Sequence, residues 1–130
     1  MLNLRFTPYP LPIKIITYIK ARTPEWESML KTTIINTFAS EDDCDMFIMV
    51  LKQQWPNYIE KLPESTLEIV KDTETPNRML ALWTFKEKSH QKIIQDLGEK
   101  IIIPYRDRLA PKTITNNWEV EHTLAIGKTN

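Results

Sequence analysis

Alternating apolar and polar side chains predict a β-hairpin in the middle of the chain. In residues 66–72 the apolar Leu67 and Ile69 alternate with polar neighbours, a period of two that is typical of a half-buried strand. A polar stretch containing Pro76 follows and favours a turn. Residues 79–85 are apolar on both faces, which predicts a strand in the interior of a sheet.

A different spacing predicts a helix over residues 24–38. Thr23 and Pro24 suit a helix start, because threonine caps the first free N–H groups and proline fits the first turn. Apolar residues then recur every fourth position, as expected for a stripe along one helix face. This stripe comprises Trp26, Leu30, Ile34 and Phe38.

A second helix is predicted after Ser40, whose side chain can cap a helix that has acids in its first turn. The apolar run 46–51 also fits a buried strand, but the cap and the polar exit over residues 52–54 favour a helix. Pro56 should end this helix, with one further turn over residues 57–62.

Two more elements are predicted in the last third of the chain. Ser89 is the expected cap of a third helix, which should stop near Gly98 and restart before Pro104. Residues 112–126 alternate and predict a final strand with one buried face. Its apolar face would contain Trp118, Val120, His122, Leu124 and Ile126.

The N-terminal region predicts two strands. Leu2, Leu4 and Phe6 alternate with polar residues, and residues 13–20 contain five β-branched side chains, which favour a strand over a helix. The whole pattern predicts an α+β fold, with a mixed or antiparallel sheet of about five strands and two to three helices packed on it. The coarse order is ββ-αα-ββ-α-β, in a single domain that spans residues 1–130.

Composition is that of a globular protein. Hydrophobic residues make up 42% of the 130 positions and charged residues 26%, too apolar for a disordered chain. No run of 18 apolar residues predicts a membrane span, and the N-terminus lacks the pattern of a secretory signal. The single cysteine and the lack of a glycosylation sequon are typical of a reducing compartment, so we expect a cytoplasmic protein.

Several kinds of chemistry are missing from the sequence. The chain has only two glycines, Gly98 and Gly127, so it contains neither a P-loop nor a dinucleotide-binding motif, and we expect no cofactor. A structural zinc site needs several cysteine or histidine ligands, whereas Cys44, His90 and His122 lie far apart in the sequence. Cys44 therefore reads as a core residue and His122 as a core or edge residue.

Charge suggests the main functional hypothesis. Residues 40–75 hold nine acids and three bases, a net charge of −6, between flanks of +3 each. Residues 41–45 hold four acids in five positions, more than helix capping needs, so the sequence suggests a docking patch for a basic protein surface. With no catalytic constellation recognised, the chain is expected to be a small non-catalytic interaction protein, a regulator or inhibitor. Its partner-binding residues would be Glu41, Asp42, Asp43 and Asp45.

Two alternatives remain open. A nucleic-acid-binding segment over residues 86–112 would hold seven bases against four acids. Its contacts would come from Lys86, Lys88, Lys92, Lys100, Arg106, Arg108 and Lys112.

The other alternative is a metal-dependent enzyme that uses Glu119 and Glu121. On a strand these carboxylates would share a face about 7 Å apart, although a solvated strand face is the simpler interpretation. The sequence leaves the oligomeric state open.

Overall fold

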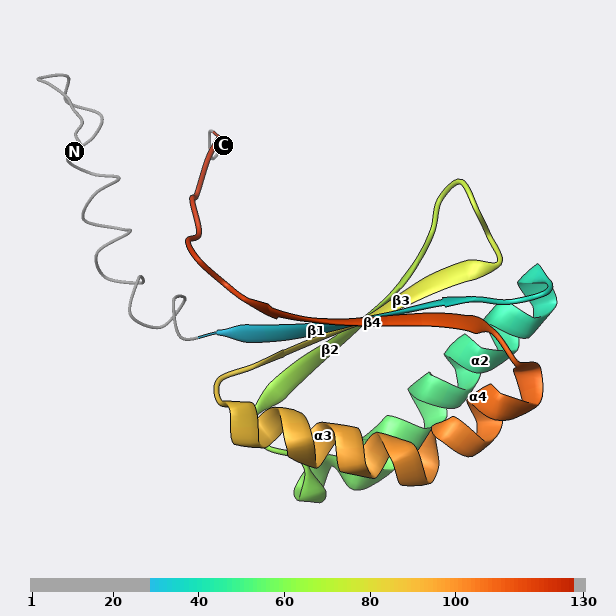
Figure 1. Ribbon diagram of the computed structural model, residues 1–130, viewed down its shortest axis with the longest axis horizontal. Coiled ribbons are helices and arrows are strands. Elements are labelled where there is room, and N and C mark those ends of the chain that lie inside the picture. The colour runs from blue at the N-terminus through green and yellow to red at the C-terminus, as the bar shows by residue number, and fades with distance from the viewer. Residues whose placement is uncertain (1–28, 128–130) are drawn as a thin grey trace, which may run out of the picture. The chain divides into compact units, whose positions relative to one another are not determined.

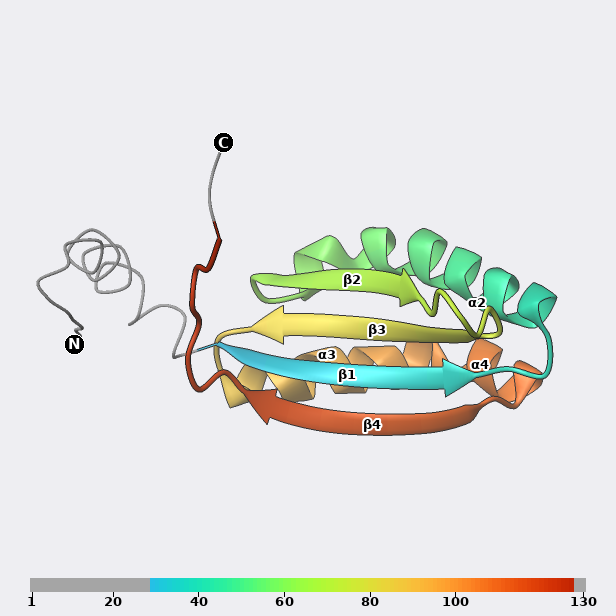
Figure 2. The same cartoon turned by 90° about the horizontal axis from the view of Figure 1, so that it is seen from above.

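The computed structural model describes residues 29–127, in which a four-stranded sheet carries helices on one face (Figure 1). The strand order is β2-β3-β1-β4, and Figure 2 shows each strand running opposite to its neighbours. The strands are β1 (Leu30–Thr37), β2 (Ser65–Lys71), β3 (Arg78–Phe85) and β4 (Lys112–Glu119). The helices are α2 (Glu41–Gln54), the 3₁₀ helix η1 (Trp55–Lys61), α3 (Lys88–Ile101) and α4 (Ile103–Leu109).

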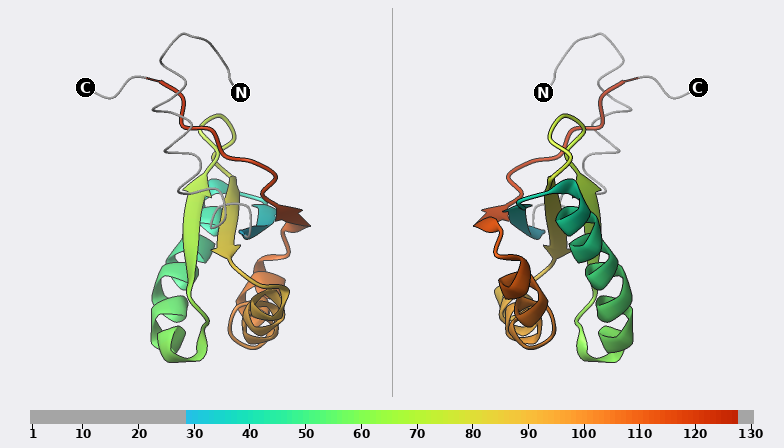
Figure 3. Two further views of the ribbon diagram at one scale, coloured as in Figure 1. Left: turned by 90° about the vertical axis from the view of Figure 1, so that its left-hand side faces the viewer. Right: turned by 90° about the vertical axis from the view of Figure 1, so that its right-hand side faces the viewer.

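The predicted α+β class with an antiparallel sheet is confirmed. In Figure 3 the helices all lie on one side of the sheet, with α2 near β2 and the α3–α4 pair toward the other edge. Residues Leu30–Trp118 form one compact unit. The strands predicted over residues 2–6 and 13–20 lie outside the described residues, and the single-domain prediction stays a prediction.

The helix predicted over residues 24–38 is wrong where the structure describes it, because Leu30–Thr37 is strand β1. Five of these eight residues are β-branched, which restricts their side chains and favours a strand. A spacing of four is also an even number, so Leu30 and Ile34 share one face of a strand as readily as one face of a helix. Of the apolar stripe, Leu30 and Ile34 therefore belong to a strand.

The predicted hairpin is confirmed, and β3 is an interior strand. β3 pairs with β2 on one side and β1 on the other, with Trp83 opposite both Leu67 and Thr32. One side of β3 is fully covered, with no residue more than 5% exposed. These covered residues are Met79, Ala81, Trp83 and Phe85.

The turn of the hairpin is organised by Asp72. Its Oδ1 accepts hydrogen bonds from the backbone N–H groups of Glu74 and Thr75, at 2.8 and 3.0 Å. Its Oδ2 accepts from the guanidinium of Arg78, with Nη2 at 2.7 Å. These bonds, chiefly the one from Glu74, favour the charged carboxylate and lower the pKa of Asp72.

Helix α2 confirms the predicted cap, since the Ser40 hydroxyl accepts a hydrogen bond from the N–H of Asp43 at 3.1 Å. Its buried face carries Cys44, Phe47 and Leu51. The apolar run 46–51, for which the sequence favours a helix over a buried strand, is helical. One further turn does follow Pro56, as part of η1.

Helix α3 differs from its prediction at both ends. The cap position is Glu87 rather than Ser89, whose hydroxyl lies 3.5 Å from the Glu87 carboxylate. The helix also runs through Gly98 and breaks only at Ile102, where α4 begins with a proline in its first turn. One glycine costs a helix about 1 kcal/mol, too little to end it when both flanking turns are packed.

The final strand is shorter than predicted, because β4 ends at Glu119. Its pairing partner β1 begins at Leu30, and just past the end of β4 the N–H of Val120 still donates to the carbonyl oxygen of Met29 at 3.1 Å. The buried face predicted for this segment is also wrong, since Trp118 is 53% exposed and all of β4 is exposed.

None of the helices described within residues 29–127 has the length and apolar character that a membrane span requires.

Candidate functional site: a cavity between the sheet and the helices

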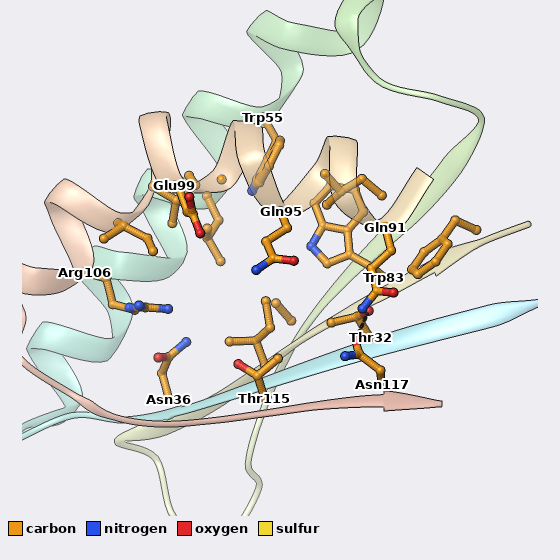
Figure 4. A pocket seen from close by; sticks show the side chains of 18 of the residues that line it. Thr32, Asn36, Trp55, Trp83, Gln91, Gln95, Glu99, Arg106, Thr115 and Asn117 are labelled. Carbon is orange, nitrogen blue, oxygen red and sulfur yellow. Dashed lines mark hydrogen bonds between the residues drawn. The ribbon is translucent and has the colours of Figure 1, made fainter. Parts of the chain in front are cut away.

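A cavity of about 300 Å³ lies between the helix-facing side of the sheet and the helices (Figure 4). Strands β1, β3 and β4 form its floor, while α2, η1, α3 and α4 supply the walls. Residues at the centre of its floor are buried, but Thr115 and Asn117 of β4 and Gln95 of α3 are exposed. The cavity therefore opens to solvent between β4 and α3.

Two tryptophans dominate the apolar wall. The rings of Trp55 and Trp83 meet edge to face, with centroids 4.7 Å apart and an interplanar angle of 78°. Gly98 of α3 faces the Trp55 ring, and a Cβ at this position would make an ordinary contact with the ring at 3.7 Å. Further apolar walls come from the core residues Phe47, Leu51, Ile94 and Ile102.

The floor of the cavity becomes polar toward β4. The hydroxyl of Thr32 donates to Oδ1 of Asn117 at 2.8 Å, which joins β1 to β4 across the floor. Next along the same strands, the hydroxyl of Thr113 donates to Oδ1 of Asn36 at 2.6 Å. Asn36 is 1% exposed, and its amide nitrogen has only the sulfur of Met79 as an acceptor, at 3.6 Å. Hydrogen bonding thus fixes both asparagines.

Two charged side chains line the cavity, Glu99 of α3 and Arg106 of α4. Glu99 is exposed, whereas Arg106 is half-buried and in Figure 4 extends into the cavity toward Asn36. Among residues 29–127, no carboxylate lies within ion-pair distance of Arg106 and no group accepts a hydrogen bond from its guanidinium. A half-buried charge without a partner is unusual, because desolvation of a guanidinium is costly.

Other donors at the cavity also lack acceptors. The indole nitrogens of Trp55 and Trp83 point toward the cavity in Figure 4, and neither donates a hydrogen bond to any described residue. The same holds for the amide nitrogen of Asn117, whose oxygen is already used by Thr32. The cavity therefore presents several unpaired N–H groups from the two tryptophans, Asn117 and Arg106.

The acidic residues singled out by the sequence lie elsewhere, at the start of α2. Glu41 and Asp45 both accept from Nζ of Lys71 on β2, at 2.8 and 2.7 Å. Hydrogen bonds to Asp45 and Glu41 raise the pKa of Lys71. Asp43 contributes only its backbone N–H to the Ser40 cap, and Asp42 is exposed. Two of the four acids, Glu41 and Asp45, are thus paired within the fold.

The basic residues of segment 86–112 do not form one surface. Lys86 pairs with Glu64 at 3.5 Å and Lys92 with Asp96 at 3.2 Å. Arg106 lines the cavity instead. Lys100 and Arg108 line a second hollow beside Tyr58 and Tyr105, while Lys88 and Lys112 are exposed at element ends.

The remaining candidates do not assemble into a metal site. Glu119 is the last residue of β4 and Glu121 lies beyond it, so the two are not held on one strand face. Among the residues described, no three His, Cys, Asp or Glu side chains are grouped to hold a metal ion. Cys44 is fully buried, as the core interpretation predicted, and burial raises the pKa of its thiol. His90 lies in α3, and its buried Nδ1 has no hydrogen-bond partner in the described part of the chain.

Most cavity residues were missed by sequence reasoning. Their signal was present in β1, where Thr32 and Asn36 occupy the same side as the apolar Ile34 and Phe38. Polar side chains at inward positions of a strand indicate either a buried network or a lined cavity. That signal was masked because this segment was assigned to a helix.

Comparisons with solved structures identify the same architecture in other proteins. No protein-family model matches the sequence, and no curated protein matches it. A structure described as "Putative antibiotic biosynthesis monooxygenase from Nitrosomonas europaea" is similar with a TM-score of 0.57 and 14% identity, over 72% of this chain and 90% of that one.

Two proteins from an uncultured marine organism, each described as a dimeric ferredoxin-like protein, are similar as well. Their TM-scores are 0.58 and 0.54 at 17% and 12% identity. Both matches cover 78% of this chain, and 95% and 98% of the other chains. At such low identity the likeness shows the fold, which is ferredoxin-like.

The hypothesis of a non-catalytic protein that docks through an acidic patch is wrong. The architecture is shared with a structure described as a monooxygenase, and the described residues enclose a cavity of small-molecule size. Two of the four acids predicted as a docking patch, Glu41 and Asp45, pair with Lys71 within the fold. The nucleic-acid and metal alternatives stay predictions, although among the described residues their bases are dispersed and no metal-binding group of three ligands forms.

Proposed function

We propose that this protein binds a small organic molecule in the cavity between the sheet and α3–α4. The observation that carries the proposal is the cavity itself, of about 300 Å³, with apolar walls and a few polar groups directed inward. Small-molecule sites combine these two features, since apolar walls supply affinity and polar groups fix orientation. The rings of Trp55 and Trp83 favour a ligand with an aromatic or otherwise flat apolar part.

Binding of N-phenyl-1-naphthylamine, a neutral aromatic dye, tests this proposal. We expect saturable one-to-one binding, with energy transfer from the tryptophans to the dye. Thr115→Phe at the mouth should weaken binding at least tenfold, because the ring would occupy the opening between β4 and α3. Asn116→Phe is the matched control, since alternation directs position 116 to the opposite face of β4. Absence of saturable binding, or equal binding by both variants, would refute the proposal.

A monooxygenase reaction on the bound molecule is a second candidate. The shared fold of the Nitrosomonas europaea protein supports it, and Glu99 is the one carboxylate that lines the cavity, where it could accept a proton from a bound hydroxyl group. Such a reaction places one atom of dioxygen in the substrate and releases the other as water. With no added reductant the substrate supplies all four electrons, so hydroquinone would give 2-hydroxy-1,4-benzoquinone and water. Oxygen uptake with hydroquinone as electron-rich probe should fall in both Thr115→Phe and Glu99→Gln. Uptake that equals the protein-free rate would argue against it.

We also propose that the chain self-associates through the face of the sheet opposite the helices. Two of the structurally similar proteins are described as dimeric. No described helix covers this face, and alternation places on it a row of apolar residues. They are Ile35, Val70, Leu80, Leu82, Ile114 and Trp118.

Light scattering coupled to gel filtration tests this self-association. Leu82→Lys, at the centre of the exposed face, should shift a dimer to monomer. Met46→Lys on α2 is the control, since Met46 is accessible at 57% exposure but lies on the helix side. A monomeric wild-type protein, or a dimer unaffected by Leu82→Lys, would exclude this interface.

A further inference from the structure

Charge in the cavity points to a narrower class of ligand. Of the two charged side chains that line it, Glu99 is exposed and Arg106 is half-buried. No described residue pairs with Arg106, although a salt bridge forms on the neighbouring helix α3, between Lys92 and Asp96. The described part of the fold therefore brings one guanidinium to the cavity without an anion paired to it.

The neutral groups around the cavity repeat this imbalance. Trp55 and Trp83 each contribute an N–H donor, and an indole nitrogen cannot accept a hydrogen bond. Asn117 has its oxygen occupied by Thr32 and leaves only its NH₂ group available. Asn36 likewise has its oxygen occupied, by Thr113. The polar residues Gln91, Gln95 and Thr115 can each donate or accept, so apart from Glu99 the groups restricted to one role are donors, which favours a ligand rich in acceptors.

We infer that the natural ligand is an organic anion, a flat apolar molecule with a carboxylate, sulfonate or similar oxyanion that Arg106 binds while the tryptophans contact its apolar part. This inference rests on the proposed small-molecule site and deepens it. A guanidinium presents paired N–H groups that match an oxyanion, and such charge-assisted bonds are about twice as strong as neutral ones. Exposed Glu99 should oppose the same anion by repulsion.

Two dyes that differ in one group provide the test. 8-Anilinonaphthalene-1-sulfonate has the rings of N-phenyl-1-naphthylamine plus a sulfonate, so a comparison of the two isolates the contribution of the negative charge. We expect the wild-type protein to bind the sulfonate dye more tightly. Arg106→Gln should weaken the sulfonate dye roughly tenfold or more and leave the neutral dye unchanged, as expected for loss of a charge-assisted hydrogen bond.

Further variants separate a specific contact between Arg106 and the sulfonate from general charge effects. Arg106→Lys should retain part of the affinity, since it keeps the charge and loses the planar geometry. Arg108→Gln removes a neighbouring positive charge that does not line this cavity, and it should change neither dye. Glu99→Gln should tighten binding of the sulfonate dye alone. The Arg106→Gln protein should also unfold at the same urea concentration as the wild type, because the native guanidinium has no partner among the described residues.

Each outcome decides between the two proposals. If the neutral dye binds in the cavity but Arg106→Gln leaves the sulfonate dye unchanged, the anion inference is overturned and the small-molecule site stands. If Thr115→Phe weakens the binding of neither dye, or neither dye binds at all, both proposals fail. A loss of affinity for both dyes in Arg106→Gln would also overturn the inference, since it would show a structural role for this side chain.

Discussion

Strands β3 and β4 present their side chains to the same layer of helices, yet the two rows meet different surroundings. On β3 the inward row, from Met79 to Phe85, is at most 5% exposed and packs under α2, η1 and α3. On β4 the inward residues Thr113, Thr115 and Asn117 are all exposed. The first row builds the core, and the second borders an opening. A polar inward row in an antiparallel sheet therefore indicates where the helical layer leaves space.

The largest effect should come from the core row. Trp83→Ala removes a ring that contacts Trp55 and should lower the free energy of unfolding by about 3–5 kcal/mol. Thr115→Ala, the matched change on β4, should alter it by about 0.5 kcal/mol or less. Urea unfolding followed by circular dichroism measures both. Similar losses in the two variants would show that β4 packs as tightly as β3.

A smaller difference is expected between the two asparagines of the cavity floor. Asn36→Ala deletes a fully buried amide and leaves the Thr113 hydroxyl without its acceptor, so it should cost about 1–3 kcal/mol. Asn117→Ala lies at the exposed mouth, where water can replace the lost bond to Thr32, and should cost less than about 1 kcal/mol. The same urea experiment compares them. If Asn117→Ala were the more damaging change, the polar row of β4 would be structural.

Gly98→Ala should raise the stability of the folded protein, whereas the preceding substitutions lower it. Alanine favours a helix over glycine by about 1 kcal/mol, and the added Cβ would make an ordinary contact with Trp55 at 3.7 Å. We expect the thermal unfolding midpoint to rise by a few degrees. A fall in this midpoint would mean that the tryptophan wall of the cavity cannot adjust to one additional methyl group.

The smallest effect should appear only as a pH dependence in the turn between β2 and β3. The folded-state pKa of Asp72 is lowered, so its stabilisation is fully present above the unfolded-state pKa of about 3.9 and is lost as the pH falls through the folded-state value. Asp72→Asn should therefore be less stable than the wild type at pH 7, with the difference shrinking in acid. Thermal unfolding at a series of pH values tests this. A difference that does not change with pH would exclude the carboxylate charge as its cause.

The sequence predicted the hairpin because both strands show a clear pattern of apolar positions. Residues of β2 are apolar on one face, and residues of β3 are apolar on both faces. It could not separate helix from strand in Leu30–Thr37 by spacing alone, and the β-branched content of that segment was the better guide. The length of β4 depended on a pairing partner that lies more than 70 residues earlier in the chain. Local alternation contains no information about where such a partner begins.

The candidate site was harder to predict than the fold. Arg106 was identified by its charge but assigned to a basic surface, since seven bases close together in the sequence suggest one face. The helix break at Ile102 directs Arg106 into the cavity and separates it from Lys92 and Lys100. The other residues that line the cavity come from strands β1, β3 and β4 and from α2, η1 and α3. Only the tertiary fold brings these segments together.

The thiol of Cys44 offers a way to follow motion of the helix layer without introducing a label site. It is the chain's single cysteine, it is fully buried under α2, and its raised pKa keeps it in the unreactive protonated form. A thiol reagent can therefore modify the native protein only when α2 moves away from the sheet. The labelling rate, compared with that of an exposed thiol, reports the free energy of this opening. Ligands that close the cavity should slow the labelling.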